Sequence, residues 1–144
     1  MPIPTFDDYC FACGRRNPIG LRMQVHYLED EPTAESHLSL APEFVGWQEV
    51  IHGGILATLL DEIMMHAIWH FAGPGVTLGL DIQFRRILAP GEVIVVRGRL
   101  TETRGRRLKA QGEIIRLADN QLIANAQGRF LLQNGAGEQP ADKP

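Results

Sequence analysis

The chain has 144 residues and a mass of 16.0 kDa, the size of one domain with room for a hydrophobic core. Hydrophobic residues make up 44% and charged residues 22%, which excludes a disordered, collagen-like or coiled-coil chain. A net charge of −3 argues against nucleic-acid binding through bulk positive charge, and no apolar run reaches the roughly 18 residues of a membrane helix.

The predicted elements begin with two strands, because apolar and polar residues alternate over residues 21–28 and 34–40. A helix is predicted from Gly53 to about Phe71, since its apolar residues recur at three- and four-residue intervals. They cover more than one stripe, so this helix should be buried on several sides. Further strands are expected over residues 76–87, 92–102, 107–117 and 121–132.

The order β-β-α-β-β-β-β predicts an α+β fold, with a long curved antiparallel sheet wrapped around one central helix. In the strand over 76–87, one face is expected to carry Val76, Leu78, Leu80, Ile82 and Phe84. Such a sheet leaves edge strands exposed, which favours pairing with another copy of the chain.

The ends of the chain suggest its organisation and its compartment. One domain is expected over residues 1–133, followed by a mobile Gly- and Pro-rich tail over 134–144. The first ten residues lack the basic and apolar regions of a signal peptide, so we expect a cytoplasmic protein. Its two cysteines, Cys10 and Cys13, would then remain thiols.

Two glycines, Gly53 and Gly54, open the predicted helix directly after His52. Free backbone N–H groups and the positive end of the helix dipole form a natural site for an oxyanion or a polarised carbonyl. The alternative is that the glycines only permit a tight turn from loop to helix. The pattern alone leaves both interpretations open.

Asp61 is a carboxylate in the middle of an apolar helix, flanked by leucines, Ile63 and Met64. Burial would raise its pKa and cost several kcal/mol without compensation, which is typical of a functional carboxylate. The alternative is that this helix face is wetter than its neighbours suggest. Glu62 has a plainer interpretation, because it can pair with His66 one turn later.

Gly53 and Asp61 are eight residues apart, or about 12 Å along a helix. Both therefore cannot touch one small reacting group within one chain. If they act together, each site takes Gly53 from one subunit and Asp61 from another. A two-fold dimer with antiparallel helices would supply two such sites.

Basic residues gather in one segment of this acidic chain. Residues 85–109 contain eight Lys and Arg against two Glu, which suits a ligand rich in phosphate. Arg97 and Arg99 alternate with apolar neighbours and are interpreted as the solvated face of a strand. The phosphate candidates lie near strand ends and a turn: Arg85, Arg86, Arg106 and Arg107.

Cys10 and Cys13 form a CxxC motif, which permits a zinc, a redox or a packing role. A closed zinc site needs four ligands, and the sequence has no second pair of cysteines. His26 and His37 fall on predicted strands rather than in a loop with ligand spacing. Packing is therefore the favoured interpretation, and no metal is expected.

The pattern His52-Gly53-Gly54 with Asp61 nine residues after the histidine resembles the hotdog-fold thioesterases. The branch is that of the phenylacetate-pathway (PaaI-like) enzymes within the 4-hydroxybenzoyl-CoA thioesterase superfamily. The resemblance runs from about residue 17 to 132. It includes the segment Pro74-Gly75-Val76-Thr77, the strand LDIQFRR and the turn Pro90-Gly91-Glu92. The lead-in CFACG, which precedes this range, also resembles the start of some proteins in this branch.

The resemblance implies roles for several residues. Gly53 would donate its N–H to the thioester oxyanion, with Gly54 beside it in the substrate site. Asp61 of the neighbouring subunit would be the general base or the nucleophile. His52 would hold the loop or polarise the thioester, and Thr77 would hold the attacking water.

The resemblance implies an acyl-CoA thioesterase that needs no cofactor, since CoA is part of the substrate. A homodimer is expected, assembled further as a dimer of dimers, with no nucleic acid or membrane partner. The alternatives are a hotdog enoyl-CoA hydratase or dehydratase, or a non-catalytic acyl-CoA-binding module. One departure is Gly46, where some relatives carry an Asn that orients substrate or water.

Overall fold

The computed structural model describes residues 8–133, so the tail predicted at 134–144 lies outside the described residues. A 3-10 turn, η1 (Pro42–Phe44), precedes the long helix α1 (Gly53–Phe71). The strands, in chain order, are β1 (His26–Leu28), β2 (Thr33–Leu38), β3 (Gly75–Phe84), β4 (Ile94–Arg104), β5 (Arg107–Arg116) and β6 (Gln121–Leu132).

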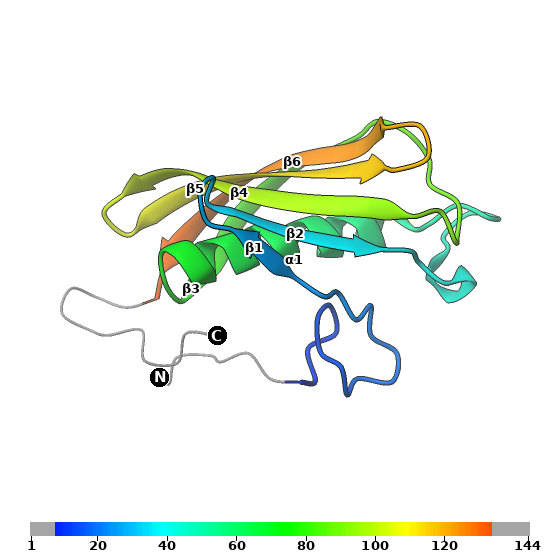
Figure 1. Ribbon diagram of the computed structural model, residues 1–144, viewed down its shortest axis with the longest axis horizontal. Coiled ribbons are helices and arrows are strands. Elements are labelled where there is room, and N and C mark those ends of the chain that lie inside the picture. The colour runs from blue at the N-terminus through cyan, green and yellow to red at the C-terminus, as the bar shows by residue number, and fades with distance from the viewer. Residues whose placement is uncertain (1–7, 134–144) are drawn as a thin grey trace.

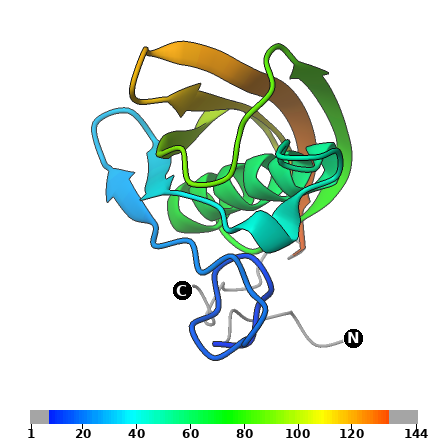
Figure 2. The same ribbon diagram turned by 90° about the vertical axis from the view of Figure 1, so that its right-hand side faces the viewer.

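The six strands form one antiparallel sheet in the order β1-β2-β4-β5-β6-β3. The sheet curls around α1, which lies along its concave side (Figures 1 and 2). The predicted α+β fold with one central helix is therefore confirmed. β1 and β3 are the edge strands, and β3 follows α1 back along its length.

α1 is buried on several sides, as its apolar pattern predicts. Leu59, Leu60, Ile63 and Met64 are fully buried in the core. The helix backbone lies close to the sheet at Gly98 of β4, where a Cβ atom would lie 2.7 Å from the Ile63 carbonyl oxygen. A glycine is therefore required where the helix backbone crosses this strand.

The first predicted strand is wrong over residues 21–25, since β1 begins only at His26. The Leu21 N–H donates to the Phe11 carbonyl and the Met23 N–H to the Ala12 carbonyl, at 2.8 and 2.9 Å. Both side chains are buried. The alternating pattern therefore reflects a loop packed onto the core, not a strand in the sheet.

The expected alternation along β3 is also wrong at its start, because a bulge shifts the register between Thr77 and Gly79. The extra residue, Leu78, is 45% exposed, whereas Leu80 and Ile82 pack against the core. A bulge reverses which residues face inward on its two sides. Thr77 therefore faces α1.

Candidate active site

The N-terminus of α1 is capped by the side chain of His52. His52 Nδ1 accepts a hydrogen bond from the Gly54 N–H at 2.8 Å, which satisfies one of the free donors of the first turn. In the neutral imidazole, the ring proton then lies on Nε2, and the His52 side chain is exposed. His52 therefore both fixes the helix start and offers a donor to a ligand.

The two glycines of the motif differ in what their N–H groups can do. The Gly54 N–H is engaged by His52, so it is not free for a substrate. The Gly53 N–H finds no acceptor within residues 8–133. The predicted oxyanion donor at Gly53 is thus available, whereas a matching role for the Gly54 N–H requires His52 to release it.

The loop before α1 is closed by backbone hydrogen bonds. The Gly46 N–H donates to the Val50 carbonyl and the His52 N–H to the Phe44 carbonyl, both at 2.9 Å. A Cβ on Gly46 would lie 2.9 Å from His52 Cδ2. Any side chain at this position would displace the imidazole ring, so the departure from Asn is coupled to the position of His52.

A cavity of about 630 Å³ opens beside the helix start. The phenyl ring of Phe84 lies 3.6 Å from the position of a Cβ on Gly53, so this ring borders the first residue of the helix. Trp47 and Ile87 also line the cavity and are 83% and 71% exposed. None of these three residues is predicted as a site residue from the sequence. Trp47, an apolar side chain in the loop just before the His52 motif, was the usable signal.

Asp61 lies half-buried in the middle of α1, facing β3. The Thr77 hydroxyl donates a hydrogen bond to Asp61 Oδ1 at 2.8 Å. Burial raises the pKa of Asp61, and the nearby charge of Glu62 acts in the same direction, while the Thr77 hydrogen bond opposes them. Asp61 and Thr77 thus form the contact that brings two predicted site residues together.

Gly53 and Asp61 remain apart within the chain. Both belong to one uninterrupted helix, so about 12 Å of helix rise separates them. The structure therefore places two half-sites on one chain: a donor beside an apolar cavity, and a carboxylate held by a hydroxyl.

The four candidate phosphate-binding arginines fall into two pairs. Arg85 and Arg86 follow the end of β3, and Arg86 lines the cavity at the helix start. Arg107 of β5 lies opposite Leu131 of β6 in the sheet, and Leu131 in turn lies opposite Val76 near the start of β3. The Arg106 side chain donates to the Leu132 carbonyl. The length of β3 places the pairs roughly 30 Å apart. Within one chain only the first pair lies near Gly53.

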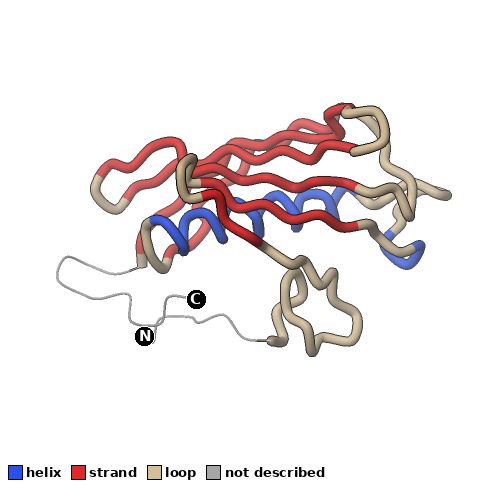
Figure 3. The backbone as a smooth tube through the Cα atoms, viewed as in Figure 1, coloured by secondary structure: helices blue, strands red, loops and turns tan. Residues whose placement is uncertain are grey.

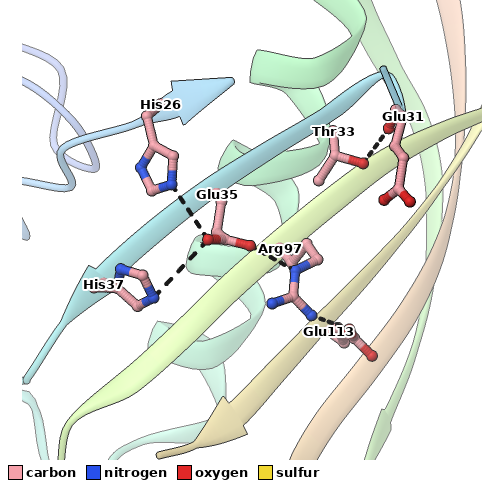
Figure 4. Close-up of polar contacts among 7 residues, drawn as sticks. All are labelled: His26, Glu31, Thr33, Glu35, His37, Arg97 and Glu113. Carbon is pink, nitrogen blue, oxygen red and sulfur yellow. Dashed lines mark hydrogen bonds and ion pairs between the residues drawn. The ribbon is translucent and has the colours of Figure 1, made fainter. Parts of the chain in front are cut away.

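Arg97 has the structural role that its alternation predicts. It lies on the outer face of the sheet, where its guanidinium contacts Glu35 at 2.7 Å and Glu113 at 2.9 Å (Figure 4). His26 Nε2 lies 3.2 Å from the same Glu35 carboxylate. Although burial would raise the pKa of Glu35, the Arg97 hydrogen bond holds it below its usual range. These charges are satisfied among themselves.

Glu62 lies next to Asp61 in sequence but contacts the N-terminal loop. Its carboxylate lies 3.3 Å from His66 Nε2, as the one-turn spacing predicts, and 3.6 Å from Cys10 Sγ. Burial would raise the pKa of Glu62, but hydrogen bonds from His66 and Cys13 lower it. Burial and the Glu62 carboxylate raise the pKa of Cys13. Within residues 8–133, Cys10, Cys13 and Glu62 are the one group placed to hold a metal ion.

A family model described as the thioesterase superfamily matches residues 48–123, just over half of the chain. The match begins shortly before the His52 motif and ends within β6. The chain therefore belongs to the thioesterase superfamily.

Solved structures of thioesterase superfamily proteins share this fold. Protein RHA08564 superposes with a TM-score of 0.81 at 24% identity, over 86% of this chain and 60% of that one. The Escherichia coli PaaI protein of the phenylacetic acid degradation operon gives 0.72 at 18%, over 78% and 80%. A Streptococcus mutans protein solved bound to acetyl-CoA gives 0.71 at 17%, over 78% and 89%. The predicted hotdog fold is thus confirmed.

A curated relative is an uncharacterized mitochondrial membrane protein of Saccharomyces cerevisiae, 24% identical over 121 residues. The match covers 81% of this chain but 50% of the yeast protein, so the chain spans half the length of that relative. Among residues 8–133, no helix has the length and apolar character needed to cross a membrane. The cytoplasmic location stays a prediction.

Proposed function

We propose that the protein is an acyl-CoA thioesterase whose site combines Gly53 of one subunit with Asp61 of another. The observation that carries the proposal is the free Gly53 N–H at the start of a 19-residue helix, beside an apolar cavity. Such a donor stabilises the negative charge that develops on a thioester oxygen. Membership of the thioesterase superfamily and the acetyl-CoA bound to the Streptococcus mutans relative support the substrate class.

The edge strand β3 supports a site shared between subunits. The half-site that contains Asp61 contacts β3 through Thr77, whose hydroxyl is hydrogen-bonded to Asp61. The half-site that contains Gly53 contacts β3 through Phe84, whose ring borders Gly53. An antiparallel pairing of two β3 strands, centred between Leu80 and Asp81, sets Thr77 opposite Phe84 of the partner subunit. The same two-fold operation brings Asp61 toward the partner's helix start and creates two equal sites.

The reaction then follows from the groups at the site. Asp61 takes a proton from water, and the water oxygen forms a bond to the thioester carbon. The Gly53 N–H and the helix dipole stabilise the oxyanion. The C–S bond then breaks, protonated Asp61 gives its proton to the leaving sulfur, and CoA leaves as a thiol beside the free carboxylic acid. A second route has Asp61 attack the carbonyl directly, giving an anhydride that water hydrolyses. Both routes need the same two residues.

Arg85 and Arg86 are the phosphate ligands in this proposal. Arg86 lines the cavity beside Gly53, and both arginines border a smaller hollow with Gln121 and Leu122. Their side chains are exposed and lie where a CoA chain leaving the apolar cavity would reach solvent. Guanidinium groups bind phosphate through paired hydrogen bonds, which fits the three phosphates of CoA.

Release of free thiol from a panel of short, long and aromatic acyl-CoAs tests the proposal. We expect wild-type protein to release thiol from at least one member, and Asp61→Asn to remain folded and lose that activity. Hydration of a crotonyl-type substrate without thiol release would indicate a hydratase instead. Saturable binding of acyl-CoA without turnover would indicate a binding module.

A further inference from the structure

The CxxC motif forms a tight turn that fixes both thiols. The Gly14 N–H donates to the Cys10 carbonyl at 2.8 Å. A Cβ on Gly14 would lie 2.4 Å from both the Asp8 carbonyl oxygen and the Cys10 nitrogen, so only glycine allows the turn to close. Residues 8–25 contain no helix or strand and lie against the side of α1 that the sheet leaves open (Figures 2 and 3).

The turn brings both sulfur atoms to a carboxylate on α1. Cys10 Sγ, Cys13 Sγ and a Glu62 carboxylate oxygen all lie within 4.8 Å of one another, and Cys10 Sγ is 3.6 Å from Glu62 Oε2. Zinc binds sulfur at about 2.3 Å and oxygen at about 2.0–2.2 Å, so neighbouring ligands of a tetrahedral site are about 3.3–3.8 Å apart. The sulfur–oxygen distance already falls in this range.

His66 offers a fourth donor beside the cluster. Its Nε2 lies 3.3 Å from Glu62 Oε2, and its Nδ1 lies 2.9 Å from Tyr27 Oη. A histidine that binds a metal through one nitrogen is commonly oriented by a hydrogen bond at the other, as Tyr27 does here. His66 is not part of the group whose ligand atoms all lie within 4.8 Å of one another, so its ring must move toward the two sulfur atoms to complete a four-ligand site.

We propose that Cys10, Cys13 and Glu62 bind one zinc ion, with His66 as the fourth ligand. Thiolate, imidazole and carboxylate are the ligands that zinc takes in proteins. The prediction of no metal rested on cysteine and histidine ligands alone. It did not include Glu62, the carboxylate that α1 supplies. The ion would fasten the loop of residues 8–25 to α1 through Glu62, which lies about 100° around the helix from Asp61. Its role is therefore structural.

Zinc uptake by the full chain tests the proposal. Protein treated with a chelator is incubated with zinc, dialysed and assayed for bound metal, and we expect one ion per chain. Cobalt in place of zinc should give the near-ultraviolet charge-transfer band of thiolate coordination. The double variant Cys10→Ser with Cys13→Ser should lose both signals. Glu62→Gln should weaken affinity at least ~10-fold, since even residues outside the metal shell cost that much.

His37→Ala is the matched control, because His37 is an exposed histidine on β2 outside the cluster. It should bind zinc as tightly as wild type. Absence of bound zinc in wild type, or zinc retained by the cysteine double variant, would overturn the proposal. Circular dichroism shows whether the double variant folds. If it does not fold, the cobalt spectrum of wild type is the test, and a spectrum without the thiolate charge-transfer band overturns the proposal.

Discussion

Gly53 carries the proposed oxyanion donor as a single N–H group, so one substitution can remove it with little other change. Gly53→Pro deletes this N–H at the first helical position, where proline is well tolerated, and His52 already has the extended backbone that a following proline needs. We expect kcat to fall by roughly 10²–10³-fold, the effect of deleting one such donor. Steady-state thiol release measures it.

Gly53→Ala is the matched control for that variant. It keeps the N–H, and its added Cβ would lie 3.6 Å from the Phe84 ring, an ordinary contact distance. It should retain kcat within a few-fold of wild type. Equal losses in the alanine and proline variants would show that space beside Phe84, and not the N–H, is what the reaction needs.

The Asp61–Thr77 pair predicts a pH dependence. A general base acts in its ionised form, and burial raises the pKa of Asp61, so activity should fall with decreasing pH from a point above the ordinary aspartate range. The Thr77 hydrogen bond lowers that pKa. Thr77→Val should therefore move the acid limb of the kcat profile to higher pH, whereas Thr77→Ser should leave it in place. An unmoved limb in the valine variant would contradict this assignment.

Residues of the site differ in how visible they are from sequence. His52, Gly53 and Asp61 stand out because an apolar helix normally contains neither a double glycine nor a carboxylate. Phe84 and Cys10 do not, since each acquires its role through a contact distant in sequence. Cys10 meets Glu62 across 52 residues, and no local pattern encodes that contact.

At the scale of elements, the packing of α1 on β4 depends on Gly98. A Cβ there would lie 2.7–2.9 Å from helix backbone atoms of Ile63 and Met64, which cannot rotate away. Gly98→Ala should therefore destabilise the fold by about 3 kcal/mol, the upper end of the usual cost of overpacking. Gly112→Ala is the comparison, because its nearest atoms belong to movable side chains. Urea unfolding checks both, and equal losses would contradict the argument.

The elements are predicted correctly where the apolar residues keep a regular spacing over many residues. They are predicted wrongly where tertiary contacts determine the backbone conformation. α1 begins at Gly53 and ends at Phe71, as its apolar repeat and flanking glycines indicate. The bulge at Leu78 was not predictable, because its residue types continue the alternation on both sides. That bulge is what faces Thr77 toward Asp61. The family resemblance named Thr77, but no sequence pattern gave the reason for its position.

For the molecule as a whole, a site shared between subunits requires a dimer formed through the β3 edge. Leu78 lies on this edge strand and is 45% exposed. A charged residue at such a position opposes pairing with another strand, so a lysine there should disrupt the dimer. Light scattering after gel filtration should give twice the 16.0 kDa chain mass for a wild-type dimer, or four times that mass where two such dimers associate. Leu78→Lys should give the mass of one chain and lose activity. Leu117→Lys, 48% exposed but beyond the end of β5, should keep the mass and the activity of wild type.

The most direct measurement of the shared site mixes two inactive subunits. Asp61→Asn and Gly53→Pro chains, unfolded and refolded together in equal amounts, form half of their dimers as mixed pairs. Each mixed dimer then has one intact site, so about a quarter of wild-type thiol release should return. Each variant refolded alone should stay inactive. No recovery from mixtures shown to contain mixed dimers would contradict the proposal that Gly53 and Asp61 act across the subunit interface.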